Sequence, residues 1–306
     1  MIGANGIAGG GTGERESSAN LGMAAFPVLE NPVRPVISHY QWPEAILHGK
    51  GWTYKDGVRD LKNLNSNANV KHDIVLNSNI KFIWNYGSNA LVNQHGEINR
   101  LLEIITDDTL VEMIVVIDNQ MTVSARYADL VLPDVTTAEQ VDLAAQGSAG
   151  ILGYTIMADK AIEPLFDSMP IYEQLSGIAE KLGVKDKFTE GRTQEEWVRW
   201  IYDESRKTIP DLPPFEEFRQ QGIFKKKLEP VIGMKKFRED PVANPLGTPS
   251  GKIEIFSSNL YAMSQDWPVD GGNAIDPLPI YRATREAPGD ALQEKYPLQC
   301  IGHHYK

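Results

Sequence analysis

The clearest pattern in the chain is a pair of apolar runs that each end abruptly in small and polar residues. The first run covers residues 80–84 and leads into the loop GSNALVNQH at residues 87–95. The second covers residues 113–117 and ends on Asp-Asn-Gln at residues 118–120. Short apolar runs bounded by turn residues are typical of strands buried in a parallel sheet. We therefore predict two neighbouring parallel strands, with both loops at their carboxyl ends.

The segments around these strands complete an α/β pattern. Residues 97–105 place apolar side chains on one helical face, and residues 129–133 form a third short apolar run closed by proline. Strand, helix and strand at these spacings fit a βαβ unit. The predicted fold class is α/β, with a Rossmann-like parallel sheet.

Later segments predict further helices and then a change from helical to β-rich structure. Helices are expected at 42–48, 171–182 and 214–222, and Thr193 with Glu196 forms a capping box before another helix. Lys225 to Lys227 are interpreted as a solvated surface turn. A Pro/Gly turn and an alternating segment at 252–257, which predicts a strand, then indicate a linker near 230–245 and the start of a β-rich, barrel-like part.

These patterns divide the chain into two predicted domains. Residues 1–235 form an α/β region with its Rossmann-like core at about 78–185, and residues 236–306 form a linker and the beginning of the β-rich domain. Residues 1–22 are like an internal loop, and the chain stops where an apolar strand turns into a polar loop. We expect a fragment of a larger multidomain fold.

Composition narrows the possible partners. The formal net charge of −11 argues against nonspecific binding to a nucleic-acid backbone, so no nucleic acid is expected. The single cysteine, Cys300, excludes a disulfide framework and a cluster or zinc site built by this chain alone. His303 and His304 would point to opposite faces of a strand and would not share a metal. No catalytic residue and no metal ligand is predicted.

The two loops carry the most suggestive chemistry. Amide side chains donate and accept, which suits a purine, a pterin or a ribose better than a bare anion. Gly87 would let the backbone approach a ligand closely, and Asp118 could accept from two donors of a ribose or a guanine. Ligands of open parallel sheets bind outside the carboxyl ends of the strands. The residue types alone leave a ligand site and a helix-capping turn both open, and Glu139 and Asp142 are equally open as caps or acid–base groups.

Five segments taken in order resemble a known family. They are IKFIWNYGSNALVNQH, IVVIDNQMTVSARYADLVLPDVTTAEQVD, EGRTQEEWVRWIY, NPLGTPSGKIEIFS and PLQCIGHHYK. Together they are similar to the molybdopterin oxidoreductase family, in its anaerobic dimethyl sulfoxide reductase branch with the selenate-reductase-like relatives. The resemblance covers almost the whole chain, and ARYADLVLP and TPSGKIEIFS are its most specific parts.

The resemblance implies a cofactor, molybdenum bis(molybdopterin guanine dinucleotide), with one of its pterin dinucleotides on the Rossmann-like domain. Residues 236–306 would then begin the molybdopterin-dinucleotide-binding β domain, although Ile301 stands where the family usually has Thr. The implied cofactor-binding residues are Gly87, Ser88, Asn93, Gln94 and His95 along the dinucleotide, Ile117 and Asp118 at its guanosine end, and His304 in the last segment.

The resemblance also implies a function for the full-length protein. It would be a terminal reductase of anaerobic respiration that acts on a small S-oxide or N-oxide. An iron–sulfur electron-transfer subunit would supply electrons, and a membrane-anchor subunit would hold the exported enzyme at the outer face of the cell membrane. The family's iron–sulfur cysteine motif, for a [4Fe-4S] cluster, and its molybdenum-ligating serine segment are absent from these residues, so we expect no activity from this chain alone. A selenate reductase, a formate-dehydrogenase-like enzyme and a non-redox nucleotide-binding protein remain alternatives.

Overall fold

The computed structural model describes residues 21–28, 30–60, 74–93, 96–149, 152–228, 234–266, 276–281 and 288–299. The chain separates into two compact units, residues 1–238 and 239–306. Each unit is described by itself below. Among the described residues, no helix is both long and apolar enough to cross a membrane.

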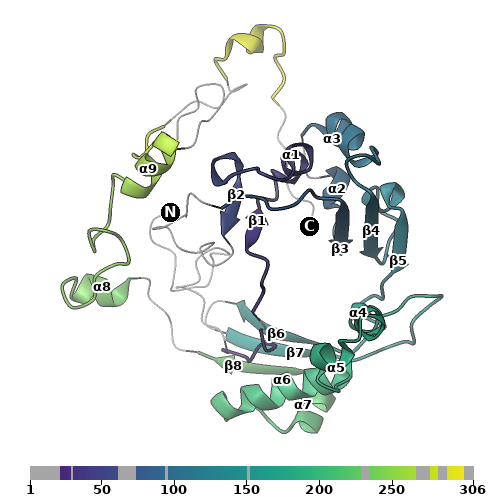
Figure 1. Cartoon of the computed structure of the whole chain (residues 1–306). Coiled ribbons are helices and arrows are strands. Elements are labelled where there is room, and N and C mark those ends of the chain that lie inside the picture. Colours follow the sequence, from purple (N-terminus) through teal and green to yellow (C-terminus); the bar gives the residue numbers. More distant parts are fainter. Residues whose placement is uncertain are drawn as a thin grey trace. The chain divides into compact units, whose positions relative to one another are not determined.

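A three-stranded parallel sheet lies in the first unit (Figure 1). Its strands are β3 (Phe82–Tyr86), β4 (Met113–Asp118) and β5 (Leu130–Pro133), in the order β3-β4-β5. Tyr86 pairs with Ile117, and Asp118 pairs with Pro133, so the three strands end together. The predicted parallel pair is confirmed, and with it the α/β class.

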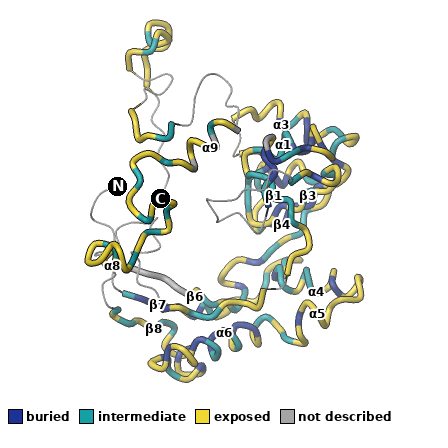
Figure 2. The backbone as a smooth tube through the Cα atoms, turned by 60° about the vertical axis from the view of Figure 1, so that its left-hand side comes forward, coloured by how far each residue is buried: buried dark blue, intermediate teal, exposed yellow. Residues whose placement is uncertain are grey.

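One face of this sheet is covered by α1 (Trp42–His48), α2 (Ala90–Asn93) and α3 (Ile98–Ile105). Side chains alternate between the faces of a strand, so Ile114 and Val116 of β4 both point toward the helices. There they meet the buried face of α3, and Figure 2 shows the resulting concentration of buried residues around β4, α1 and α3. This core fixes the positions at which the strands end.

A second, antiparallel sheet follows in the chain. It consists of β6 (Asp142–Ala149), β7 (Leu152–Ala158) and β8 (Ile223–Lys227), in that order. Residues Lys225 to Lys227 therefore belong to an edge strand, and their prediction as a surface turn is wrong. Lysines on an edge strand discourage pairing with another chain, which explains a charged run in a strand.

Two helices, α6 (Gln194–Thr208) and α7 (Phe215–Gln221), pack against this second sheet. The core between them is centred on Tyr202, Leu212 and Phe218, all at most 2% exposed. The predicted capping box at the start of α6 is confirmed, since Thr193 accepts from the Glu196 N–H and the Glu196 carboxylate accepts from the Thr193 N–H.

The remaining elements of the first unit are short, apart from one longer helix. A small antiparallel pair is formed by β1 (Pro35–Ile37) and β2 (Val58–Asp60), and a 3-10 turn, η1, spans Tyr54–Asp56. A second 3-10 turn, η3 (Ser124–Tyr127), links β4 to β5. The helices α4 (Ile171–Lys181) and α5 (Lys185–Thr189) follow the antiparallel hairpin.

The described part of the second unit has little regular structure. It holds α9 (Ser258–Asp266) and the 3-10 turn η5 (Ala291–Glu294), while α8 (Lys235–Glu239) lies within the predicted linker. No strand forms among its described residues, so the predicted strand at 252–257 is wrong for this structure. Ile253 and Ile255 are 65% and 72% exposed. An alternating segment becomes a strand only against a partner that buries its apolar face, and the described residues offer none here.

Candidate functional site

The loop after β3 leaves the parallel sheet at its carboxyl edge. The N–H of Gly87 donates to the carbonyl of Ile117, 2.9 Å away, at a φ of +56°. No described atom lies within 4 Å of the place a β carbon would take at Gly87. The backbone is therefore open at this point, as a close approach by a ligand requires.

Two polar side chains hold this loop in shape from the sheet side. Asn85, in β3 and largely buried, donates through Nδ2 to the carbonyl of Ser88 at 2.6 Å. The Ser88 hydroxyl accepts from the N–H of Ala90 at 3.1 Å, which turns the chain into α2. Asn93 ends that helix and is exposed, and its side-chain amide has no hydrogen-bond partner among the described residues. The predicted residues Gly87, Ser88 and Asn93 thus lie on one segment after β3, in which the predicted loop is interrupted by the short helix α2.

The loop after β4 begins with Asp118, which is half-buried. Its Oδ1 accepts from the N–H of Gln120 at 3.2 Å, and its other carboxylate oxygen accepts from no described residue. Asp118 is therefore partly a turn cap and partly available. Ile117 differs, because its side chain is fully buried and its carbonyl is occupied by Gly87. Of this predicted pair, only Asp118 presents an open polar group.

Tyr86, at the end of β3, was not singled out by sequence reasoning. Burial raises the pKa of the Tyr86 phenol, and the carboxylate of Asp134, just after β5, raises this pKa further. The side chain is nevertheless 49% exposed. Tyr86 and Asp134 thus add a neutral phenol and a carboxylate to the same edge of the sheet that carries Asp118.

The loops after β3 and β4 are joined by a contact between Asn89 and Ser124, which the sequence did not reveal. Asn89 Oδ1 accepts from both the N–H and the hydroxyl of Ser124, at 2.9 and 2.8 Å. Ser124 is fully buried. Neither residue stands out by spacing or periodicity, since Asn89 lies among other amides and Ser124 in an ordinary turn. Only the pairing of the strands brings them together.

Three of the implied cofactor-binding residues lie outside the described part of the chain. They are Gln94, His95 and His304. Their predicted roles stay predictions. Ile301, which stands where the family usually has Thr, also lies outside the described residues.

The chemistry of this edge fits the nucleotide part of a pterin dinucleotide. Asp118 offers an open acceptor, Asn93 an open donor and acceptor, and Gly87 an exposed backbone, which together match the edge of a purine and a ribose. The described residues contain no group of three or more His, Cys, Asp or Glu side chains able to hold a metal ion. The described residues of this edge thus fit the organic part of such a cofactor.

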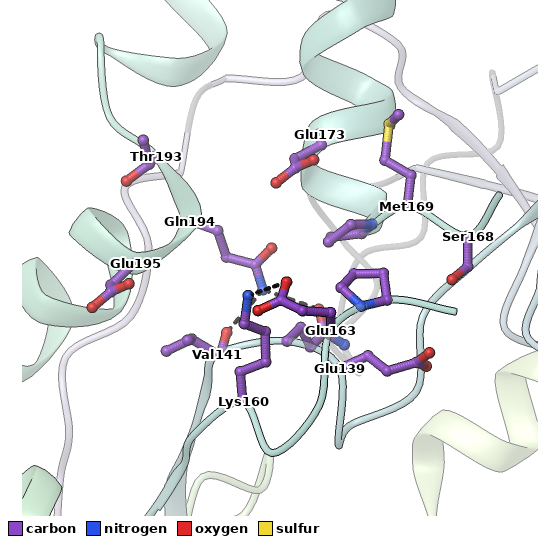
Figure 3. Close-up of a pocket in the computed structure, with 13 residues that line it drawn as sticks. Glu139, Val141, Lys160, Glu163, Ser168, Met169, Glu173, Thr193, Gln194 and Glu195 are labelled. Carbon is purple, nitrogen blue, oxygen red and sulfur yellow. Dashed lines mark hydrogen bonds and ion pairs between the residues drawn. The ribbon is translucent and has the colours of Figure 1, made fainter. Parts of the chain in front are cut away.

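A hollow lies elsewhere in the first unit (Figure 3). It measures about 490 Å³ and lies between the first turns of α4 and α6 and the segments after β5 and β7. Figure 3 shows Lys160 and Glu163 meeting at its centre, where they form an ion pair of 2.7 Å. Gln194 donates to Gln140 and to the carbonyl of Val141 at 3.0 and 2.9 Å. The polar groups here satisfy one another, which is typical of a packing junction.

Glu139 lines the same hollow and has a structural role. Its carboxylate accepts from the N–H and hydroxyl of Thr136, both at 2.7 Å, and from the N–H of Leu165 at 2.8 Å. These bonds, those of Thr136 first, lower the pKa of Glu139 below its ordinary value. Of the two possibilities left open by the sequence for Glu139, the geometry matches the cap. Asp142 begins β6, and its Oδ1 accepts from the N–H of Leu143 at 2.7 Å.

Comparison with known protein sequences shows the family of this chain. The family model for molybdopterin oxidoreductases matches residues 2–181. "Dimethyl sulfoxide reductase DmsA" of Haemophilus influenzae is 49% identical, and that of Escherichia coli 50%, over 100% of this chain. The chain spans 37% and 36% of the lengths of these relatives. A solved structure, acetylene hydratase from Pelobacter acetylenicus, is 22% identical over 72% of this chain and 26% of its own, with a TM-score of 0.46. The chain belongs to the molybdopterin oxidoreductase family, which implies a molybdenum–molybdopterin cofactor.

Proposed function

We propose that the carboxyl edge of the β3-β4-β5 sheet binds the guanosine end of a molybdopterin guanine dinucleotide. The observation that carries this proposal is the open carboxylate oxygen of Asp118, beside a loop that exposes Asn93 and the backbone of Gly87. A carboxylate can accept from the ring N–H and the amino group of guanine at once, and the corresponding edge of adenine offers no such pair of donors. We therefore expect the edge to bind guanine more tightly than adenine.

We infer further that the full-length protein is a reductase of S-oxides or N-oxides. Identities of 49% and 50% to proteins named dimethyl sulfoxide reductase support this more than a selenate reductase or a formate-dehydrogenase-like enzyme. The molybdenum centre supplies the oxygen-atom transfer, and this chain's part is to bind and orient the cofactor. The proposal also includes two partners, an iron–sulfur electron-transfer subunit and a membrane-anchor subunit. It further includes a [4Fe-4S] cluster outside these residues and export of the enzyme across the cell membrane.

The nucleotide part of the proposal is tested on the 306-residue chain. We expect it to bind guanosine diphosphate more tightly than adenosine diphosphate in calorimetric titration. Asp118→Asn should weaken the binding of guanosine diphosphate by about tenfold, because the substitution removes a charged acceptor. Asp108→Asn is the matched control, since Asp108 is exposed in the turn that leads into β4, at the opposite edge of the sheet. Equal affinity for the two nucleotides, or an unchanged affinity in Asp118→Asn, would contradict the proposal.

The enzymatic part needs the full-length protein purified without oxygen. We expect bound molybdenum, the fluorescence of released pterin, and oxidation of a reduced dye with dimethyl sulfoxide or trimethylamine N-oxide. Absence of both molybdenum and pterin would favour the non-redox alternative. Turnover of selenate or formate in place of the oxides would point to the other two enzyme classes.

A further inference from the structure

Ser124 is a buried polar residue between the two loops of the proposed site. It begins η3, directly after the loop that starts at Asp118, and its side chain is fully buried. Both of its donors, the N–H and the hydroxyl, meet the single acceptor Asn89 Oδ1 at 2.9 and 2.8 Å. A buried hydroxyl without such partners would be costly, so the contact is strongly specified.

The same hydroxyl also acts as an acceptor. The N–H of Val92 in α2 donates to Ser124 Oγ at 3.3 Å. The first N–H groups of a helix have no partner inside that helix, so Ser124 satisfies one of them from the neighbouring loop. The helix concerned ends at Asn93, the exposed amide of the first loop. Ser124 is thereby joined to the first loop at Asn89 and at Val92.

These bonds make one network out of two loops. The base of the first loop is tied to β4 by the bond from Gly87 to Ile117, and its far end is tied to the second loop through Ser124. The separation between Asn93 and Asp118 is therefore set at both ends. Satisfied buried polar networks hold a single arrangement of the groups around them.

We propose that Asn89 and Ser124 are positioning residues for the guanine nucleotide, acting through Asn93 and Asp118. This inference rests on the proposed function of the sheet edge. Ser124 is fully buried and both of its donors are taken up by Asn89, so it acts without touching the ligand. Loss of the network leaves the two loops free to separate, and the nucleotide then meets its two contacts at the wrong distance.

The test compares two buried serines in the 306-residue chain. Ser124→Ala removes the link, and Ser205→Ala is the matched control. Ser205 is also fully buried, and its hydroxyl donates to the Ile201 carbonyl at 2.7 Å and accepts from the Ala24 N–H at 2.9 Å, far from the sheet edge in the sequence. Both variants should lower the melting temperature. Only Ser124→Ala should raise the dissociation constant for guanosine diphosphate, by about tenfold, as outer-shell partners do in metal sites.

A second pair of variants keeps the test decisive if Ser124→Ala fails to fold. Asn89→Ala removes the shared acceptor, whereas Asn89→Asp retains an oxygen that can accept from both donors of Ser124. We expect the affinity to fall in Asn89→Ala and to be restored in Asn89→Asp. Unchanged affinity in Ser124→Ala or in Asn89→Ala, while the original chain binds guanosine diphosphate, would overturn the positioning role alone. Failure of the folded original chain to bind it would overturn the proposed nucleotide site itself.

Discussion

Gly87, the first residue after β3, donates a hydrogen bond of 2.9 Å from its N–H to the carbonyl of Ile117 in β4. Gly87 makes this bond with a φ of +56°, in the left-handed region. Residues with a β carbon pay about 1 kcal/mol or more to adopt this region. Because no described atom lies within 4 Å of the position of an added β carbon, the requirement for glycine is one of backbone conformation and not of space.

Gly87→Ala is therefore expected to lower the free energy of unfolding by about 1 kcal/mol, as measured by urea denaturation. Gly177→Ala is the matched comparison, because Gly177 lies inside α4 and also has open space where its β carbon would stand. Alanine should raise the free energy of unfolding there by about 0.5–1 kcal/mol. Equal effects of the two substitutions would show that the loop after β3 is not held in the left-handed conformation.

The capping box of α6 gives a second prediction. Thr193→Ala removes the oxygen that accepts from the Glu196 N–H and should cost about 1 kcal/mol of unfolding free energy. Thr208→Ala, at the exposed other end of the same helix, should change it by less than about 0.5 kcal/mol. A comparable loss in both variants, measured by urea denaturation, would mean that the cap contributes nothing special.

Local patterns explain which parts of the fold could be predicted. The strands at Met113–Asp118 and Leu130–Pro133 were predicted because they are short apolar runs bounded by turn residues. The helix at Ile171–Lys181 was predicted because its apolar residues recur with the helical period. The strand Ile223–Lys227 was missed because its three lysines carry no apolar period. Its identity as a strand comes from pairing with β7, which is a long-range contact and leaves no local pattern.

The candidate site shows the same division. Gly87 and Asp118 could be singled out because strand ends that finish in small and polar residues are visible in the sequence. Asn89 and Ser124 could not, because their contact joins loops 35 residues apart in the chain. Tyr86 was overlooked for a related reason, since its partner Asp134 follows a different strand. Side chains that act through one another are found only when the register of the sheet is known.

The ion pair between Arg219 and Asp159 predicts a dependence on acid. Arg219 donates to both carboxylate oxygens of Asp159, at 2.6 and 2.8 Å, and this lowers the pKa of Asp159 below its ordinary 3.8. The unfolded chain then binds the proton more readily than the folded chain does. The contribution to stability is present above pH 3.8 and is lost as the pH falls through the lower folded pKa.

Asp159→Asn should therefore reduce the free energy of unfolding at neutral pH by at most about 1 kcal/mol, because the pair is partly exposed. The difference from the original chain should shrink as the pH falls from about 6 to about 2 in urea denaturation series. Asp203→Asn serves as a control, since the distance between Asp203 and Arg199 is 3.8 Å and both side chains are about half exposed. A difference for Asp159→Asn that stays constant across this pH range would contradict the linkage.

Tyr202 makes the corresponding prediction for alkaline conditions. Its ring is fully buried and stacks on Phe218 with centroids 4.5 Å apart, and its hydroxyl donates to the carbonyl of Pro213 at 2.9 Å. Burial raises the pKa of Tyr202 from 10.0 to about 12. The folded state thus resists losing the proton. The stabilisation is fully present below pH 10.0, the ordinary pKa, and is lost as the pH rises toward about 12.

Tyr202→Phe keeps the stacked ring and removes the hydroxyl, so at neutral pH it should cost about 1 kcal/mol, the net contribution of one hydrogen bond. Phenylalanine does not ionise, and the buried tyrosine would have to, so the disadvantage of the variant should shrink between pH 10.0 and about 12. Tyr281→Phe is the control, because Tyr281 is 90% exposed and should change stability little at any pH. A cost for Tyr202→Phe that grows in alkali would mean that the Tyr202 hydroxyl is ionised in the folded protein, against its buried position between α6 and α7.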